Sequence, residues 1–379
     1  MRPALHLALA LFVLCPIAVA GDAPAAAPPG GPQAVKIGKP EGVYHVFVPP
    51  AHDGLRSLPL VVALHGANTT AEKAILPWIE LAKSRGWIVV APQARGLRWL
   101  DADGDIVQAA VEDCRTKYRV DPDRICLAGL SSGGLMATRW GLGGLRRFAC
   151  IFAHSGVQLP ADLKSAGKVP VMLSCGEKDE FMEETRNSDA ALRKAGFDTE
   201  LAAWPGETEE KTPPAVFGRA YSFFEERLGR PAIRLARCIR ARKDKRWADA
   251  ASDCAALLGE GIERKIRLDA ENEKRAIEYA GLDLLKKAVN RAHREPVEGK
   301  KDLAALARAF TGFETGERAK EALREIDPGD GRGPDTKPAE PQPEEPDPED
   351  AKPEEPGPED PGPDGPPPDG PPPKDPAPK

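Results

Sequence analysis

The order of apolar segments between Val43 and Gly229 is the feature that most constrains the fold of this chain. Short apolar runs such as "LPLVVALHG", "WIVVAP" and "RICLAG" read as strands, and they alternate with stretches that have the spacing of amphipathic helices. "ACIFAHSG", "VPVMLSCG" and "TELAAW" continue the series. Strands that are apolar throughout and separated by helices predict a doubly wound α/β domain, with a mostly parallel sheet covered on both faces. We place this domain at residues 35–229.

The segment 230–326 contains no further run that reads as a strand. "RLARCIRARKDKRWADAASDCAALLGEG" and "LAALARAFTGFETGERAKEALREI" have helical spacing, and the second faintly resembles helical repeats of the tetratricopeptide type, although no repeating period is established. We expect an all-helical domain that is either a protein-interaction or dimerisation module or a plain stabilising bundle. The basic "KDKR" is expected to be a solvated helix face, and no nucleic-acid partner is expected.

The first 20 residues predict a signal peptide. "MRPALHLALALFVLCPIAVA" has an early arginine, an apolar run of secretory length and small residues that suit cleavage before Gly21. Cys15 raises the alternative of a lipid anchor, but Leu14 stands where such a site requires a small side chain. We expect a secreted or periplasmic protein without a membrane span, and a linker rich in Pro, Ala and Gly at residues 21–34.

The segment 327–379 has an extreme composition. It contains 20 prolines, 16 acidic and five basic residues, so its net charge of −11 exceeds in magnitude the −6 of the whole chain. A segment with almost no apolar side chains cannot offset the entropy lost on ordering. We therefore expect a disordered tail that acts as a spacer or solubilising segment in preference to a specific binding motif.

Six cysteines remain after the predicted signal peptide. Export would permit disulfides, but four of the six lie in segments predicted to be buried strand or helix, so we expect at most one or two bridges. Cys238 with Cys254 is the preferred pair. No C-x-x-C spacing and no suitable histidine pair indicates a zinc site.

The stretch "DADGD", residues 101–105, imitates a calcium-binding loop. It offers oxygen ligands at the first, third and fifth positions, with Glu112 at the twelfth, but Ile106 stands where the turn of such a loop requires glycine. We therefore interpret the stretch as an ordinary loop in which Asp105 caps a helix, and we expect neither a metal nor a cofactor.

A catalytic motif stands between a predicted strand and a predicted helix in "RICLAGLSSGGLMA". It reads G-x-S-x-G from Gly129 to Gly133. A serine in a strained turn between strand and helix needs glycines two residues to either side, because the two elements must approach closely. If Ser132 were the nucleophile, the first glycine would be replaced by Leu130, so we predict Ser131 as the nucleophile.

With this motif the chain resembles the α/β-hydrolase superfamily, in particular secreted esterases grouped with polyhydroxybutyrate depolymerases, feruloyl esterases and phospholipase/carboxylesterase-like proteins. The resemblance covers roughly residues 43–228 and also rests on "YRVDPDRICLAGLSSGG" and "ALHGANTT". It implies an α/β-hydrolase fold, an ester or acyl substrate that includes polymeric and glycosidic esters, and an oxyanion hole made by the backbone N–H groups of Ser132 and Ala67. Rigid donors of this kind are typically worth ~3 kcal/mol each.

The resemblance also assigns the acid of the triad. In "VMLSCGEKDEFM" a strand followed by G-x-x-D presents Asp179 at the carboxyl edge of the sheet, where the family keeps the carboxylate that orients its histidine. The alternative is that Asp179 caps the helix that begins near Glu180. The order of serine before acid fits a triad that ends with histidine.

The expected histidine is absent. In the relatives the strand after the acid leads into a loop that reads like "PGxGH", whereas "PGETE", residues 205–209, places Glu209 at the position of the histidine. No histidine occurs between His154 and His293. Loss of the base of a serine hydrolase removes about 10⁶ in rate, or ~8 kcal/mol.

Three side chains, those of His154, Glu209 and His293, are candidates for the missing base. His154 follows a strand next to the serine turn, although its alternative role is that of a hydrogen-bonded histidine at a strand end. Glu209 would need a strongly raised pKa. His65 is expected to shape the oxyanion loop, and His293 would require the helical domain to fold over the site.

Two hypotheses follow for the function. The first is a secreted serine esterase that uses Ser131, Asp179 and an unorthodox base. The second is a catalytically inactive hydrolase fold that serves as a binding protein, with the helical domain as the module that contacts a protein partner.

Overall fold

The computed structural model describes residues 31–50, 52, 54–145, 147–207, 212–259 and 261–326. The predicted signal peptide at 1–20, residues 21–30 of the linker, Glu209 and the tail at 327–379 lie outside the described residues. All the described residues belong to one compact unit. None of the helices in the described ranges is long and apolar enough to cross a membrane.

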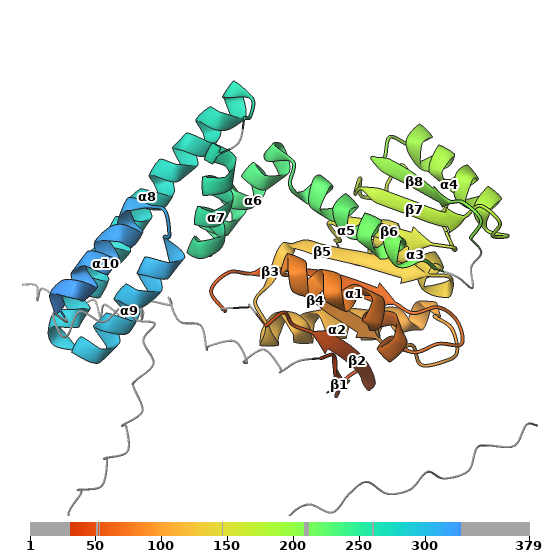
Figure 1. The fold of residues 1–379 in the computed structure, drawn as a ribbon, viewed down its shortest axis with the longest axis horizontal. Coiled ribbons are helices and arrows are strands. Elements are labelled where there is room, and N and C mark those ends of the chain that lie inside the picture. The colour runs from red at the N-terminus through yellow and green to blue at the C-terminus, as the bar shows by residue number, and fades with distance from the viewer. Residues whose placement is uncertain are drawn as a thin grey trace, which may run out of the picture. The chain divides into compact units, whose positions relative to one another are not determined.

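Eight strands form one sheet in the order β1-β2-β4-β3-β5-β6-β7-β8 (Figure 1). β2 runs antiparallel to both β1 and β4, and the pairs from β4 through β8 are parallel. The strands are β1 (Gln33–Ile37), β2 (Gly42–Phe47), β3 (Leu58–Leu64), β4 (Ile88–Pro92), β5 (Val120–Leu130), β6 (Cys150–His154), β7 (Val171–Gly176) and β8 (Thr199–Trp204).

Helices cover both faces of this sheet because successive side chains of each parallel strand point to opposite sides. In β3, Leu60 and Val62 belong to one core and Val61 and Ala63 to the other. The helices packed on the first core are α2 (Gly104–Lys117), α3 (Ser132–Gly143) and α4 (Met182–Lys194), and those on the second are α1 (Ala71–Arg85) and α5 (Pro214–Leu228). The predicted doubly wound, mostly parallel α/β fold is confirmed.

The edge strand β1 was not predicted, and its first two residues fall inside the segment assigned to the linker. Its sequence, "QAVKI", carries one buried side chain, at Ile37. An edge strand with so little buried surface lacks the apolar signal by which the other strands were recognised. Its main chain is held by antiparallel pairing with β2.

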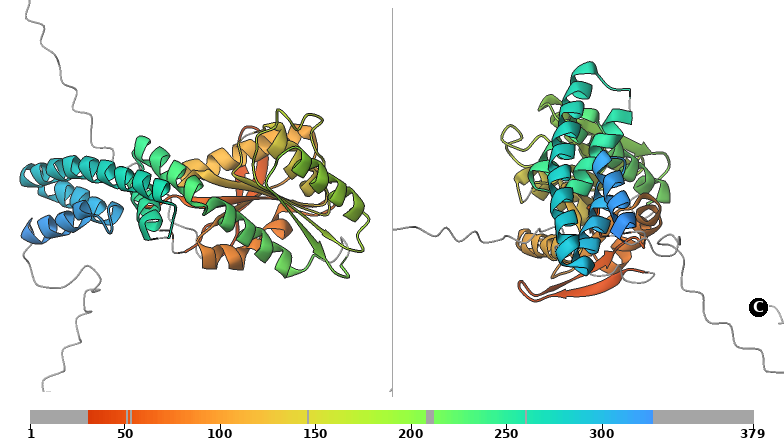
Figure 2. Two further views of the ribbon diagram at one scale, coloured as in Figure 1. Left: turned by 90° about the horizontal axis from the view of Figure 1, so that it is seen from above. Right: turned by 90° about the vertical axis from the view of Figure 1, so that its left-hand side faces the viewer.

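The helical region after the sheet consists of α6 (Pro231–Lys243), α7 (Trp247–Gly259), α8 (Arg264–Arg294), α9 (Pro296–Ala309) and α10 (Glu314–Ile326). It has a core of its own, in which Ile277, Leu303 and Phe310 are buried. The long helix α8 packs against the other four helices of this region (Figure 2). The predicted all-helical character of this part of the chain is confirmed.

A buried polar junction joins the helical region to the sheet. Both carboxylate oxygens of Asp249 in α7 accept hydrogen bonds from Ser57, one from its main-chain N–H at 2.8 Å and one from its hydroxyl at 2.7 Å. Arg246 pairs with Asp249 at 2.8 Å, and Arg237 lies 3.8 Å from Asp121. Ser57 directly precedes β3, and Asp121 is the second residue of β5. The helices therefore attach at the amino ends of the strands.

Candidate active site

Ser131 has a strained backbone at the turn from β5 to α3. Its φ of 51° and ψ of −121° lie in a region that residues other than glycine seldom adopt. Such a conformation typically costs about 1–3 kcal/mol and persists where the surrounding structure imposes it. Here the N–H of Ser131 donates a hydrogen bond to the carbonyl oxygen of His154 at 2.8 Å.

The two flanking glycines are required by close backbone contacts. A Cβ on Gly129 would overlap the carbonyl oxygen of Gly133, and a Cβ on Gly133 would overlap the carbonyl oxygen of Leu64. Both obstacles are main-chain atoms, which cannot rotate away as a side chain can. The spacing of the motif thus serves the packing of α3 against β3 and β5, which is the reason predicted for it.

The first residue of α3 and the turn after β3 carry the two predicted oxyanion donors. The N–H of Ser132 is the first of α3 and therefore has no acceptor within the helix. The turn that contains Ala67 follows β3, and a Cβ built on the preceding Gly66 would lie 3.6 Å from the Cβ of Ser131. The next residue, Asn68, is fixed by a hydrogen bond from its N–H to the carbonyl of Leu97 at 2.7 Å. The arrangement is compatible with the predicted oxyanion hole.

His65 is fully engaged in holding this turn. Its Nε2 accepts a hydrogen bond from the N–H of Ala94 at 3.1 Å, so Nδ1 carries the proton and donates it to the carbonyl of Gly66 at 2.7 Å. Trp99 packs against the ring and donates its indole N–H to the carbonyl of His65 at 2.8 Å. Burial lowers the pKa of His65. With both nitrogens occupied, the ring is neutral and serves the shape of the loop.

Asp179 lies in the turn between β7 and α4. Its Oδ1 accepts a hydrogen bond from the N–H of Phe181 at 2.9 Å. Phe181 is itself the N-cap of α4 and that helix has no side-chain cap, so Asp179 does not cap it as the alternative interpretation expected. Its Oδ2 is buried and has no hydrogen-bond partner among the described residues. The Asp179 carboxylate also lies near the Cys175 thiol, whose pKa is raised to about 11 by burial and by the negative charge of Asp179.

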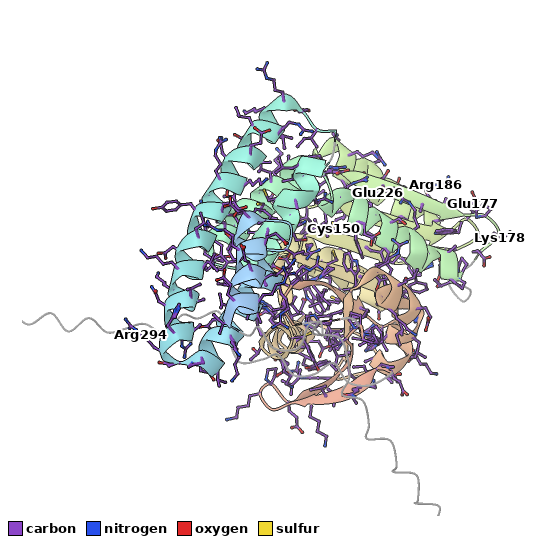
Figure 3. The ribbon with its side chains drawn as sticks, turned by 60° about the vertical axis from the view of Figure 1, so that its left-hand side comes forward. Cys150, Glu177, Lys178, Arg186, Glu226 and Arg294 are labelled. Atoms are coloured by element: carbon purple, nitrogen blue, oxygen red, sulfur yellow. The ribbon has the colours of Figure 1, made fainter. Side chains whose placement is uncertain are left out.

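The loop that carries the histidine in the relatives lies beside the turn of Asp179. The N–H of Lys178 donates to the carbonyl of Glu207 at 3.1 Å, and the N–H of Glu177 donates to that of Trp204 at 3.0 Å. Figure 3 shows Glu177 and Lys178 in the loop after β7. Residues 205–207 therefore reach the position predicted for this loop, while Glu209 itself lies outside the described residues.

His154 points its ring at Ser174 in the neighbouring strand β7. Its Nδ1 is 3.0 Å from the Ser174 hydroxyl, which also accepts the indole N–H of Trp204 at 2.7 Å. Burial lowers the pKa of His154 to about 4, although the negative charge of Asp179 acts in the opposite direction. In the part of the chain that the structure describes, the Ser131 hydroxyl makes no hydrogen bond to an imidazole. The role of His154 as a base stays a prediction.

Sequence reasoning missed the network of Ser174 and Trp204. The available signal was a polar residue inside the apolar run "VMLSCG" and a tryptophan at the end of "TELAAW". The register that pairs β7 with β8 brings the two residues together, and this register is not readable from either segment alone.

His293, the remaining candidate base, lies near the end of α8. Its ring is exposed, and its Nδ1 contacts the carbonyl of Val289 in the same helix at 2.8 Å. Because the helical region attaches at the amino ends of the strands, the structure does not bring His293 to Ser131, which follows the carboxyl end of β5.

The acidic stretch that imitates a calcium loop forms ion pairs with arginine. Arg95 pairs with Asp103 at 3.3 Å and with Asp105 at 2.8 Å. Within the described ranges no group of three or more His, Cys, Asp or Glu side chains is arranged to hold a metal. The expectation that Asp105 caps a helix was wrong, because α2 begins at Gly104 and Asp105 lies inside its first turn. There the Oδ1 of Asp105 accepts a hydrogen bond from the N–H of Ile106 at 2.6 Å.

The six cysteines expected in the mature chain are all buried free thiols. The bridge expected between Cys238 and Cys254 is therefore not formed. The two thiols nevertheless interact, and this contact raises the pKa of Cys238 and lowers that of Cys254.

Comparisons with known proteins find similarity to hydrolases and esterases. The sequence pattern of the dienelactone hydrolase family matches residues 91–209, less than half of the chain, in a span that includes Ser131 and Asp179. Among curated proteins, "Putative esterase NocK" of Nocardia uniformis subsp. tsuyamanensis is 31% identical over 140 residues, which cover 32% of this chain and 40% of that protein. The chain thus spans well under two thirds of the length of this relative.

Solved structures of esterases are among those similar to the chain. An arylesterase has a TM-score of 0.45 at 14% identity, with 54% of this chain and 88% of the arylesterase covered. A hyperthermophilic esterase from the archaeon Pyrobaculum calidifontis has a TM-score of 0.43 at 17% identity, with 53% and 87% covered. From its sheet topology, its serine turn and the family match, this chain has an α/β-hydrolase fold and resembles the esterases of that superfamily.

Proposed function

We propose that this chain is an exported serine hydrolase that cleaves an ester or a related acyl bond, with Ser131 as the nucleophile and Asp179 as the acid of its triad. The observation that carries this proposal is the backbone of Ser131, held at a φ of 51° between two glycines that tolerate no Cβ. The dienelactone hydrolase match and the esterase relative support hydrolysis as the class of reaction.

The reaction proceeds in two steps that use the same groups. The Ser131 oxygen attacks the acyl carbonyl carbon, and the N–H groups of Ser132 and Ala67 stabilise the oxyanion that develops. The alcohol leaves with a proton, and water then attacks the acyl-enzyme and releases the acid.

The general base that takes the Ser131 proton is not the usual histidine. Glu209 and His154 are the two candidates. Glu209 follows the loop that lies against the turn of Asp179, and a second carboxylate near Asp179 would have a raised pKa. His154 contacts the serine through its main chain, while its ring faces Ser174.

A fluorophosphonate probe tests the nucleophile. We expect the probe to label the wild type and Ser132→Ala, and to leave Ser131→Ala unlabelled. Ser132→Ala is the matched control because it removes the neighbouring hydroxyl and keeps the backbone donor. Equal labelling of the wild type and Ser131→Ala would exclude Ser131 as the nucleophile.

A second candidate function is binding without catalysis. It is favoured by Glu209 at the position of the histidine, and by the absence of an imidazole hydrogen bond to the Ser131 hydroxyl within the described residues. In this case the helical region and the hydrolase fold together would hold a protein partner. Turnover of p-nitrophenyl acetate that is lost in Ser131→Ala would exclude it.

The proposed export rests on the sequence of residues 1–20. The test is expression of the full chain with its own leader, followed by determination of the N-terminal residue of the protein recovered outside the cytoplasm. A mature chain that begins at Gly21 is expected. Recovery of the uncleaved chain in the cytoplasm alone would exclude export.

A further inference from the structure

Two leucines on one short loop are exposed next to the candidate oxyanion hole. Leu97 is 74% exposed and Leu100 is 56% exposed, and both lie in the segment 93–100 that follows the carboxyl end of β4. We call these two side chains the leucine rim. Single exposed leucines are common on protein surfaces, so the inference depends on how this loop is held and where it lies.

The loop is fixed to the rest of the domain on both sides of Leu97. The N–H of Ala94 and the indole of Trp99 hydrogen-bond to His65, as described for that residue. The N–H of Leu100 donates to Oδ2 of Asp103 at 2.9 Å. Trp99 is buried, although the residues on either side of it are exposed. The exposure of the two leucines is therefore imposed by the anchors of the loop.

The same anchors place the main chain of Leu97 beside the turn that contains Ala67. The carbonyl of Leu97 accepts the N–H of Asn68 at 2.7 Å, and Asn68 directly follows Ala67, the proposed oxyanion donor. One residue before Ala67, Gly66 approaches Ser131 so closely that a Cβ on it would lie 3.6 Å from the Cβ of the serine. An ester bound at Ser131 therefore has the Leu97 loop at the edge of its oxyanion site.

We propose that Leu97 and Leu100 bind the aliphatic acyl chain of the substrate, so that the hydrolase favours esters of medium-length fatty acids over acetyl esters. This inference rests on the proposed function. An apolar chain that leaves the polar reaction centre gains free energy by covering apolar surface, and a loop that is already ordered loses little entropy when it binds. A short acetyl group does not reach beyond the reaction centre and gains nothing from the rim.

The test compares p-nitrophenyl octanoate with p-nitrophenyl acetate. We expect Leu97→Ser and Leu100→Ser each to lower the ratio of kcat/KM for octanoate over acetate by about tenfold, mainly through KM, because a few methylene contacts are worth that factor. Leu268→Ser is the matched control, since Leu268 is an exposed leucine in α8 with 55% exposure. An unchanged ratio in both rim variants would overturn the proposal.

Binding of octanoate and acetate, followed by NMR titration, keeps the inference testable if the protein does not turn over esters. Tighter binding of octanoate than of acetate, reduced in Leu97→Ser, supports the proposed role of the leucine rim. This holds even if the wild type shows no hydrolysis, a result that would refute only the proposed function. Equal binding of the two acids refutes the rim. The two acids could bind equally while the wild type self-associates and Leu97→Ser does not. This result would assign the leucines to a contact between two copies of the chain.

Discussion

The main-chain N–H of Ser131 donates a hydrogen bond to the main-chain carbonyl of His154 across 2.8 Å, while the ring of the same histidine turns to Ser174. The closest histidine to the serine by backbone contact thus supports the turn and has its Nδ1 engaged elsewhere. His154 therefore supports the shape of the serine turn through its main chain, but its ring does not act on the Ser131 hydroxyl in this arrangement.

Glu209→His is expected to raise esterase activity. The substitution introduces the histidine that the α/β-hydrolase resemblance implies at this position, in the loop that follows the contact with the turn of Asp179. Because the base of a serine hydrolase contributes up to about 10⁶ in rate, a gain of at least 100-fold in kcat/KM for p-nitrophenyl acetate is expected. Glu210→His, one residue along, is the control. A gain that is equal in the two variants would contradict the assignment of the position.

His154→Gln is expected to retain neutral-pH activity within about tenfold and to change the pH dependence of stability. The pKa of about 4 lies below the ordinary 6.5, so the folded state keeps this ring neutral where the unfolded chain takes up a proton. The stability contributed by the neutral ring is complete above pH 6.5 and is lost as the pH falls towards 4, by up to about 3 kcal/mol.

The measurement is the free energy of unfolding by urea at pH 7 and at pH 4.5. The wild type should lose about 2 kcal/mol more than His154→Gln over this interval. Equal losses in the two proteins would show that His154 is not buried in its neutral form. A loss of activity above 10⁴-fold in His154→Gln at pH 7 would instead identify the histidine as the base.

Gly133→Ala is expected to destabilise the protein by at least about 3 kcal/mol. The new Cβ would overlap the main-chain carbonyl of Leu64, which cannot move without disturbing β3. Gly143→Ala is the control within the same helix, because a Cβ there meets nothing within 4 Å and alanine is the better helix former. Thermal unfolding of both variants checks the prediction, and equal midpoints would contradict the close packing of the turn.

Asp249→Ala is expected to lower stability by about 2–4 kcal/mol and to leave esterase kinetics unchanged. It removes the acceptor of both Ser57 hydrogen bonds and takes one ion-pair partner from the half-buried Arg246. Activity should persist because Ser57 precedes β3, whereas Ser131 follows the carboxyl end of β5. Asp283→Ala, which breaks an exposed pair with Lys287, should change stability by less than about 1 kcal/mol. A fall in kcat with Asp249→Ala would show that the junction and the site are coupled.

The elements that could be predicted from the sequence are those whose signal is local. The parallel strands are continuous apolar runs, and the motif that marks the serine turn occupies five consecutive residues. The edge strand β1 was missed because its side chains are mostly exposed. The contact between Ser57 and Asp249 joins residues 192 apart in the chain, so no local pattern could indicate it.

In the candidate site, too, some features could be predicted from the sequence and others could not. Ser131 follows β5 and Asp179 follows β7 in the same parallel sheet, so their placement at its carboxyl edge could be predicted from the strand order. The orientation of the His154 ring could not, because it depends on the register of β6 against β7 and on the indole of Trp204 in β8.

The positive φ of Ser131 has a consequence for how the chain balances folding against chemistry. Glycine adopts this conformation without penalty, so Ser131→Gly should relieve about 1 kcal/mol or more and raise the melting temperature while it removes the hydroxyl. If Ser131 is the nucleophile, its strained backbone is a trade of stability for reactivity, and the melting curve of this one variant measures the size of that trade.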